Sequence, residues 1–290
     1  MFEGFTTSDI DAGGTTIHTV HGGSGPPLLL LHGYPQTHVM WHKIAPRLAE
    51  RFTVVATDLR GYGDSGKPPS DADHSAYSKR TTARDQVEVM AALGFETFLV
   101  AGHDRGGRVA HRMALDHPQR VTKLAVLDIV PTHKIFSTVT KEIATGYYHW
   151  FFLIQGGGLP ETLIGHDPEY YLRTKFKQWG GGMEAFTEEA LTEYVRCFSD
   201  PACIHASCED YRAAASIDLD HDEADMDRKV RCPVLALWGE KGLMERHYDV
   251  LATWRERAAD VRGRKLRCGH YLPEEAPEDT LAELIGFFTE

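Results

Sequence analysis

The chain has 290 residues, of which 42% are hydrophobic and 25% charged, the balance of a folded globular protein. Its longest apolar run, Pro26 to Leu31, is too short to cross a bilayer, which excludes a helical membrane protein. A net charge of −11, from 31 basic and 42 acidic side chains, argues against nucleic acid and anionic membrane as partners.

The five cysteines are scattered, and no CxxC pair occurs. Cys203, His205 and Cys208 are close in sequence, but no fourth ligand accompanies them, so we expect free thiols and no metal centre. The first residues contain neither a basic stretch nor an apolar run. Together with the free thiols, this favours a cytoplasmic protein.

Strand-like and helix-like segments alternate up to residue 130 and again after about residue 216. Between them lies an aromatic, helical stretch punctuated by glycine triplets. The alternation predicts an α/β fold with a mostly parallel sheet and helices on both faces. We expect a core domain of residues 1–130 and 217–290, with 131–216 inserted as a helical cap. The expected strands are 15–21, 27–31, 52–59, 97–103, 121–129, 233–238 and 264–268, and the expected helices are 41–50, 80–93, 105–116, 243–257 and 274–289.

A turn between a strand and a helix carries the sharpest local signal. Gly102-His103-Asp104-Arg105-Gly106 follows the strand 97–103 and opens the helix 105–116. Flanking glycines permit a strained turn that lifts the central side chain above the sheet edge. The arrangement is typical of a nucleophile, with Asp104 where serine hydrolases carry serine. The alternative is an aspartate that caps the helix.

An aspartate nucleophile is ionised near neutral pH, so its attack needs no base. The ester that it forms must then be hydrolysed by water, and this second step does need one. His270 is the candidate base, because its loop between the last strand and the last helix faces the same sheet edge. The alternative is a surface histidine, one of sixteen in the chain.

The acid that would orient His270 is less obvious. Hydrolases of this topology often carry it after the strand that follows the cap, but Gly242 stands there, and Glu240 lies too close to the strand end. Asp128, which follows the strand after the turn, is better placed to hold the imidazole tautomer and stabilise its cation. The alternative is a polar residue that only terminates a strand.

The loop His32-Gly33-Tyr34-Pro35 follows the strand 27–31. The backbone N–H groups of Tyr34 and Arg105 are expected to form an oxyanion hole for the ester-hydrolysis step. Sequence alone leaves open whether Pro35 is cis.

These motifs resemble the α/β-hydrolases over essentially the whole chain. The resemblance rests on the HGYP loop, on Asp58-Leu59-Arg60-Gly61-Tyr62-Gly63-Asp64-Ser65, on the GHDRGGR turn and on the late GHYLPEE segment. They are similar to the dehalogenase and epoxide-hydrolase branch. The GHDRGGR turn combined with Tyr148-His149-Trp150-Phe151-Phe152 closely resembles the fluoroacetate (haloacetate) dehalogenases.

The resemblance implies that Arg105 and Arg108 hold a substrate carboxylate. Their i, i+3 spacing puts both guanidinium groups on one face of the first helical turn, where forked donors suit a carboxylate. It also implies that His149, Trp150 and Tyr211 donate hydrogen bonds to a departing halide. Alternatively, Arg108 is a surface residue and the aromatic run is ordinary cap core. Tyr147, Tyr148, Tyr170, Tyr171 and Tyr194 compete for the role of Tyr211.

The sequence therefore predicts a hydrolytic dehalogenase of short 2-haloacids that needs no metal or organic cofactor. Resemblance to the family suggests a homodimer. Two alternatives remain open: an epoxide hydrolase with the same Asp–His–Asp set, and a non-catalytic ligand receptor on the same scaffold. An epoxide hydrolase would need two cap tyrosines rather than two arginines beside the nucleophile.

Overall fold

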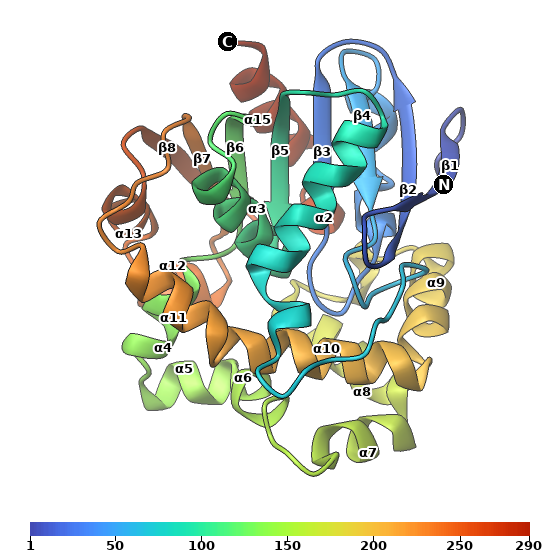
Figure 1. The fold of residues 1–290 in the computed structure, drawn as a ribbon, viewed down its shortest axis with the longest axis vertical. Coiled ribbons are helices and arrows are strands. Elements are labelled where there is room, and N and C mark those ends of the chain that lie inside the picture. The colour runs from blue at the N-terminus through green and yellow to red at the C-terminus, as the bar shows by residue number, and fades with distance from the viewer.

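In the computed structural model, which describes residues 1–290, eight strands form one sheet in the order β1-β2-β4-β3-β5-β6-β7-β8 (Figure 1). The pairs β1–β2 and β2–β4 are antiparallel, and all other neighbours are parallel. The predicted α/β fold with a mostly parallel sheet is thus confirmed. The strands are β1 (Thr6–Asp11), β2 (Thr16–Gly23), β3 (Pro27–Leu31), β4 (Thr53–Thr57), β5 (Phe98–His103), β6 (Val121–Leu127), β7 (Val234–Gly239) and β8 (Val261–Leu266).

Central strands are apolar on both faces because helices cover both sides of the sheet. Leu28 to Leu31 of β3 are completely buried, and every residue of β5 is buried. The parallel pairing of these strands sets Leu31 opposite Gly102. The loops that follow them therefore leave the sheet side by side, at its carboxyl-terminal edge.

The helices of the core pack on the two faces of this sheet. In Figure 1, α2 and α3 lie in front of it and α15 behind it. The core helices are α1 (Ala45–Leu48), α2 (Lys79–Ala92), α3 (Asp104–Asp116), α12 (Leu243–His247), α13 (Val250–Arg257), α14 (Leu272–Glu275) and α15 (Pro277–Thr289), and short 3₁₀ helices span His38–Trp41, Ser75–Tyr77 and Met183–Ala185.

A second group of helices gathers below the sheet in Figure 1, beyond the carboxyl ends of the strands. It interrupts the chain between β6 and β7, where the sequence predicts an inserted helical region. Its members are α4 (Thr132–Ser137), α5 (Lys141–Gly146), α6 (Tyr148–Phe152), α7 (Leu159–His166), α8 (Pro168–Trp179), α9 (Glu188–Phe198), α10 (Pro201–Ala214) and α11 (Ile217–Ala224).

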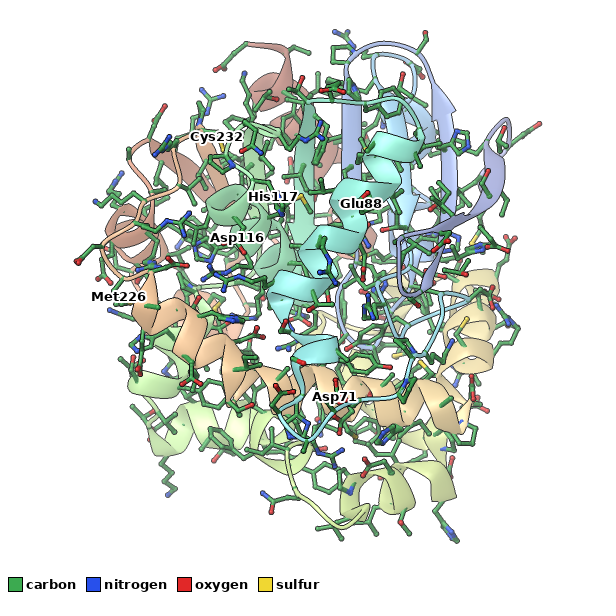
Figure 2. The ribbon with its side chains drawn as sticks, viewed as in Figure 1. Asp71, Glu88, Asp116, His117, Met226 and Cys232 are labelled. Atoms are coloured by element: carbon green, nitrogen blue, oxygen red, sulfur yellow. The ribbon has the colours of Figure 1, made fainter.

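α11 connects this group back to the core through ion pairs with α3. Arg112 Nη1 lies 2.5 Å from Asp225 Oδ2, and Arg112 Nη2 lies 2.9 Å from Asp222 Oδ1. Asp116, labelled in Figure 2 at the end of α3, also accepts hydrogen bonds from Arg112 and Arg80. These buried and half-buried pairs hold the chain against the core before β7 begins.

Several elements differ from the expectations. The helix expected at 274–289 is divided into α14 and α15, and the strand expected at 264–268 is β8, Val261–Leu266. β1 is absent from the expected strands, because Ile10 is the only large apolar residue in it. The helix expected at 41–50 is a 3₁₀ turn followed by the short α1. The helix expected at 243–257 is divided into α12 and α13, because Asp249 caps a new helix by accepting from Ala252 N. No helix is long and apolar enough to span a membrane.

Candidate active site

The turn between β5 and α3 is strained and tightly packed. Asp104 has φ +44°, a left-handed conformation that a non-glycine residue adopts only when its surroundings hold it. A Cβ on Gly102 would lie 2.4 Å from Gly106 O, and one on Gly106 would lie 2.4 Å from His32 O. Glycine is therefore required on both sides, where the turn passes the neighbouring backbone.

Asp104 is buried with one carboxylate oxygen already held. Tyr34 N donates to Asp104 Oδ2 at 3.0 Å. The Tyr34–Pro35 peptide bond that follows is cis. Burial alone would raise the pKa of Asp104, but the charges of His270, Arg108 and Arg105 outweigh it and lower the pKa below its ordinary value. The carboxylate is therefore ionised at neutral pH.

His270 lies at the same sheet edge and is bound to Asp128. His270 Nδ1 donates to Asp128 Oδ2 at 2.6 Å, which leaves Nε2 as the free nitrogen. Burial opposes the charged imidazole, yet the hydrogen bond and charge of Asp128, with the charge of Asp104, raise the pKa of His270. His103 Nε2 also donates to the backbone carbonyl of His270 at 2.8 Å, joining the turn to the histidine loop.

Asp128 occupies a special position between two strand ends. It follows β6 with φ +51°, and its Oδ1 accepts from Gly239 N at 2.9 Å. Gly242 passes close by: a Cβ there would lie 3.3 Å from Asp128 Oδ1. The absence of a side chain at 242 leaves room for the carboxylate of Asp128, whereas Glu240 is exposed.

Arg105 and Arg108 are both buried, and each is only partly satisfied. Arg105 Nε and Nη2 donate to the Oδ2 and backbone carbonyl of Asp210, at 2.6 and 2.9 Å. Arg108 Nη1 donates to Val130 O at 2.8 Å and to Thr132 Oγ1 at 3.3 Å. Arg105 Nη1 and Arg108 Nε and Nη2 are buried without any partner. Unpaired buried guanidinium nitrogens are costly, and such groups indicate a ligand.

His149, Trp150 and Tyr211 converge on the two arginines. The ring centroid of Tyr211 lies 5.4 Å from His149 and 5.8 Å from Trp150. The Arg105 guanidinium stands 4.1 Å from the centroid of Tyr211, and that of Arg108 stands 4.5 Å from Trp150. Tyr211 OH and His149 Nδ1 are buried without a partner. Three potential donors therefore surround the arginine pair.

The competing tyrosines are placed differently. Tyr194 OH donates to a buried glutamate at 2.6 Å, and Tyr170 is 70% exposed. Tyr148 turns its ring toward a lysine, with the ammonium 3.6 Å from the centroid. Tyr147 stacks on Trp150, with the ring centroids 5.9 Å apart. Tyr171 stacks on Phe198, with the ring centroids 6.0 Å apart. Tyr211 is thus the one of these tyrosines whose ring lies against the Arg105 guanidinium.

Asp210 is a site residue that sequence reasoning missed. Besides Arg105, its Oδ2 accepts from Tyr62 OH at 2.9 Å, and its Oδ1 pairs with Lys79. These contacts hold its pKa well below the ordinary value although it is buried. No local motif predicts that Asp210 binds Arg105, because the two residues are far apart in sequence.

Lys175 was also missed. It is completely buried on α8, with its ammonium facing the rings of Tyr148 and, at 5.2 Å, Trp179. Burial lowers its pKa to about 7, and its charge helps to lower the pKa of His149. The four-residue spacing of Tyr171, Lys175 and Trp179 on one helix face was a usable signal.

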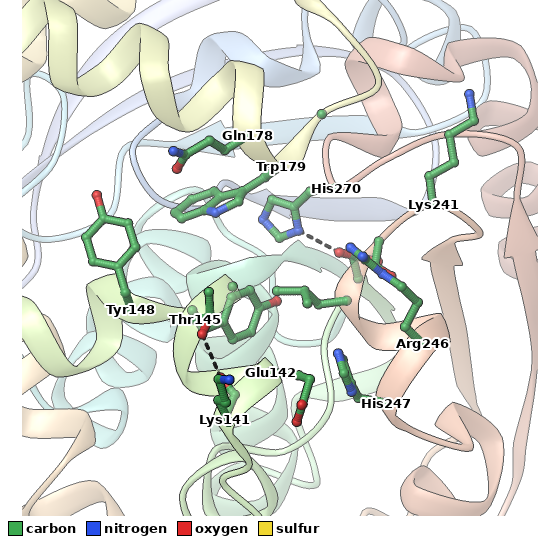
Figure 3. A pocket seen from close by; sticks show the side chains of 16 residues that line it. Lys141, Glu142, Thr145, Tyr148, Gln178, Trp179, Lys241, Arg246, His247 and His270 are labelled. Carbon is green, nitrogen blue, oxygen red and sulfur yellow. Dashed lines mark hydrogen bonds and ion pairs between the residues drawn. The ribbon is translucent and has the colours of Figure 1, made fainter.

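A cavity of about 670 Å³ leads from the surface to His270 (Figure 3). Asp128, His270 and Trp179 line it, together with residues of α5, α6 and α12. The side chains of Asp104, Arg105 and Arg108 are buried and do not line it.

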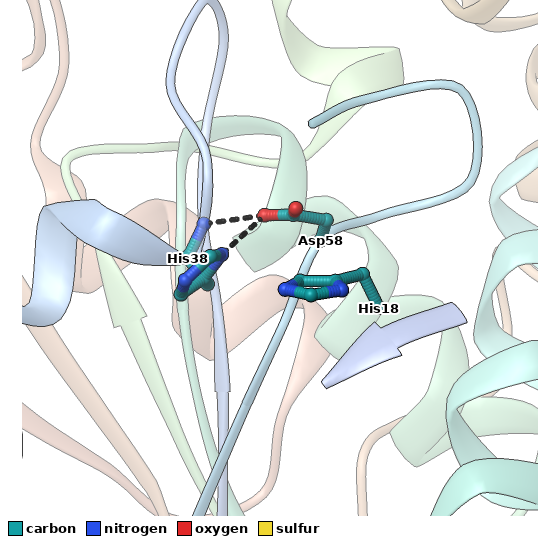
Figure 4. Close-up of side chains that lie close together, drawn as sticks. All are labelled: His18, His38 and Asp58. Atoms are coloured by element: carbon teal, nitrogen blue, oxygen red, sulfur yellow. Dashed lines mark hydrogen bonds and ion pairs between the residues drawn. The ribbon is translucent and has the colours of Figure 1, made fainter. Parts of the chain in front are cut away.

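A second cluster lies at the end of β4, where His18, His38 and Asp58 offer ligand atoms within 4.8 Å of one another (Figure 4). Asp58 Oδ1 already accepts from the backbone N and Nδ1 of His38, at 2.7 and 2.8 Å, and its Oδ2 accepts from Asp64 N. Because the carboxylate is fully engaged, this cluster is a structural clamp on the loop rather than a metal site.

Comparisons with known proteins cover the whole chain. A family profile described as the alpha/beta hydrolase fold matches residues 26–277. Fluoroacetate dehalogenase from Burkholderia sp. is 48% identical, over 100% of this chain and 96% of the relative. Soluble epoxide hydrolase from Corynebacterium sp. (strain C12) is 37% identical, over 95% and 94%. A protein from Nostoc sp. PCC 7120, provisionally described as an alpha/beta hydrolase, superposes with a TM-score of 0.99 at 65% identity over 100% of both chains.

Proposed function

The chain belongs to the α/β-hydrolase superfamily, in the branch that contains fluoroacetate dehalogenase and soluble epoxide hydrolase, and we propose that it is a hydrolytic dehalogenase of short 2-haloacids. Fluoroacetate is the foremost candidate substrate, with glycolate and halide as products.

One observation carries this proposal: the unpaired guanidinium nitrogens beside Asp104. Arg105 Nη1 and Arg108 Nε and Nη2 are buried donors that a substrate carboxylate would satisfy. A neutral epoxide would leave them unsatisfied. The site therefore favours an anionic substrate over a neutral one.

In the first step, an Asp104 oxygen attacks the halogen-bearing carbon as the carbon–halogen bond breaks. The halide leaves with the bonding electron pair, and an ester joins Asp104 to the substrate. His149, Trp150 and Tyr211 are placed to donate to the halide as its charge develops, since they lie around the carboxylate-binding arginines.

In the second step, water attacks the Asp104 ester carbonyl while His270 Nε2 takes a proton from it. Asp128 stabilises the resulting imidazolium through its 2.6 Å hydrogen bond. The backbone N–H groups of Tyr34 and Arg105 serve the tetrahedral oxyanion, and Tyr34 N already donates to Asp104 Oδ2. Collapse releases glycolate, whose oxygen recovers the proton from His270.

The competing functions are an epoxide hydrolase and a non-catalytic receptor. The test measures fluoride and chloride release from fluoroacetate and chloroacetate by the purified protein, beside diol formation from styrene oxide. We expect multiple turnovers of halide release and none by freshly prepared Asp104→Asn, whose amide is a poor nucleophile. Diol formation without halide release would replace the proposal with the epoxide hydrolase, and inactivity on both substrates would favour the receptor.

The remaining assignments are part of the same proposal. They are a core of residues 1–130 and 217–290, a cap of 131–216, a cytoplasmic location and a homodimer. The exposed apolar side chains Leu159, Leu163 and Tyr170, on α7 and α8, offer one surface for such a dimer. Sedimentation velocity tests the oligomeric state.

A further inference from the structure

Three basic side chains at the mouth of the cavity above His270 form no ion pair. Lys141 begins α5, Lys241 lies in the loop before α12, and Arg246 lies on α12; all three are exposed and line the cavity (Figure 3). None of them forms a salt bridge. The one polar contact of the Arg246 guanidinium is from Nε to Gly242 O, at 3.1 Å.

The acidic groups that line this mouth or flank Arg246 are engaged or turned away, and the exposed Glu240, next to Lys241 in sequence, does not line the cavity. Asp128, at the floor, is bound to His270. Glu245, beside Arg246, pairs instead with Lys265 at 2.5 Å and accepts from Trp238 Nε1. Glu142 is the only acidic residue on the rim, and its carboxylate points away from His270 in Figure 3.

The local charge is therefore opposite to the charge of the whole molecule. The chain carries −11, so a small anion that approaches at random meets a repulsive surface. The mouth offers three cations that form no ion pair, against one rim carboxylate, that of Glu142. Low-dielectric walls concentrate such a field, and this raises both the local concentration and the arrival rate of anions.

The packing of α5 against α12 keeps the bases together. A Cβ on Gly146 would lie 2.7 Å from the side chain of Leu243, so the two helices touch closely. This close contact between α5 and α12 keeps Lys141 near Lys241 and Arg246.

From this geometry we propose that Lys141, Lys241 and Arg246 form an outer anion-capture site. It attracts the substrate carboxylate to the mouth before the buried pair Arg105 and Arg108 binds it. This inference rests on the proposed function for the identity of the anion, but the field at the mouth exists for any small anion.

The probe for this field is the fluorescence of Trp179. It lines the cavity and is the one tryptophan of five that is not buried, so a collisional quencher that enters the mouth reports chiefly on it. Iodide is an anionic quencher and acrylamide a neutral one. The test variant combines Lys141→Gln, Lys241→Gln and Arg246→Gln. The control combines Arg51→Gln, Arg84→Gln and Arg231→Gln, three exposed residues away from the cavity that remove the same total charge.

At an ionic strength of about 0.1 M, where the Debye length is about 10 Å, we expect the test variant to lower the iodide quenching constant about threefold. Acrylamide quenching should stay unchanged, and the control should match the wild type with both quenchers. At about 0.5 M the iodide difference should shrink to less than about 1.5-fold, because salt screens the field. Equal losses in both variants, or no loss in either, would overturn the capture site.

Haloacetate kinetics provide the second readout. The test variant should lower kcat/KM about fivefold at low ionic strength, and the control should not. A wild-type protein that releases no halide would refute the proposed function only, since iodide quenching still tests the mouth. A loss of kcat/KM that persists at high salt would attribute the effect to contact geometry and overturn electrostatic capture.

Discussion

Asp104 and His270 are perturbed in opposite directions by one another and by their neighbours. The pKa of Asp104 is lowered and that of His270 raised, so near neutral pH the proposed nucleophile is ionised, while the proposed base keeps its proton to a higher pH than a free imidazole. The two proposed chemical steps should therefore respond differently to mutation and to pH.

Removal of the base should separate the steps. His270→Ala is expected to release about one halide per active site from bromoacetate and then stall, because the ester on Asp104 persists. Intact-protein mass spectrometry should show one added carboxymethyl group, and peptide mapping should place it on Asp104. Asp104→Asn controls for alkylation of the free thiols. Steady turnover by His270→Ala, or a specific adduct elsewhere, would refute the division of labour.

The pH dependence follows from the signs of the two shifts. His270 must be neutral to take a proton, and its pKa lies above the ordinary value of 6.5, so turnover should already decline below about pH 7. The first halide released in a rapid-quench experiment should stay constant from about pH 5 to 8, because Asp104 has a lowered pKa and remains ionised. A burst that falls in parallel with turnover would show that His270 takes part in the first step.

Trp150 provides a test of leaving-group stabilisation. Trp150→Phe keeps most of the packing against the Arg108 guanidinium, 4.5 Å away, but removes the N–H donor. Fluoride carries the most concentrated charge, so we expect fluoroacetate turnover to fall about 100-fold and bromoacetate turnover about tenfold. Equal losses for the two substrates would indicate a packing role.

At the residue scale, strand order made Asp104, Asp128 and His270 predictable neighbours, since each follows a strand at the same sheet edge. The structure brings them together, with Asp128 bound to His270. The partner of Arg105 was not predictable, because Asp210 lies on α10, about a hundred residues away in sequence, and meets Arg105 only in the folded chain. The burial of Lys175 was not predicted, because the side chain of a lysine on a helix is normally solvated.

At the scale of elements, the turn that carries Asp104 depends on how closely the neighbouring chain segments approach it. Gly33 shows this best, because a Cβ there would lie 2.6 Å from the Cβ of Asp104 and 2.7 Å from His103 Nδ1. Both contacts are too short to persist, so either the loop 32–35 or the nucleophile must move.

We therefore expect Gly33→Ala to lower the free energy of unfolding by about 1–3 kcal/mol and to reduce halide release sharply. Gly156→Ala is the matched control, since nothing lies within 4 Å of a Cβ at that position. Denaturant unfolding and a halide assay measure both effects. Wild-type stability and activity in Gly33→Ala would mean that the loop yields freely and does not fix Asp104.

The helices and strands were predictable where the spacing of apolar residues fits only one type of secondary structure. The apolar runs of β3 and β5 and the turn between β5 and α3 left little doubt about their type. The division of the helix expected at 243–257 was not predicted, because the helical spacing of apolar residues continues across Asp249. The side chain of Asp249 caps the start of a new helix. The sequence did not predict β1, because this polar edge strand is specified by its pairing with β2 and not by its own composition.

For the whole molecule, Asp210 ties the helices inserted between β6 and β7 to the core at several points. It lies on α10 and binds Arg105 from α3, Lys79 from α2 and Tyr62 from the loop after β4. The same carboxylate therefore anchors the cap and orients one arm of the proposed carboxylate-binding pair. Stability and substrate affinity should be coupled through it.

Asp210→Asn tests this coupling. The amide keeps the shape but removes the charge, which leaves the buried Arg105 without a counter-ion and leaves Lys79 with Asp218 alone, at 3.5 Å. We expect the free energy of unfolding to fall by about 3–5 kcal/mol, the cost of breaking a buried pair from one side. The KM for haloacetates should rise more than kcat falls, because Arg105 loses its orientation but Asp104 keeps its place. Asp227→Asn, at an exposed position outside these contacts, should leave both quantities unchanged. A destabilised variant with an unaltered KM would show that Asp210 only fastens the cap, and Arg105 would then be oriented by the packing of Tyr211 against it.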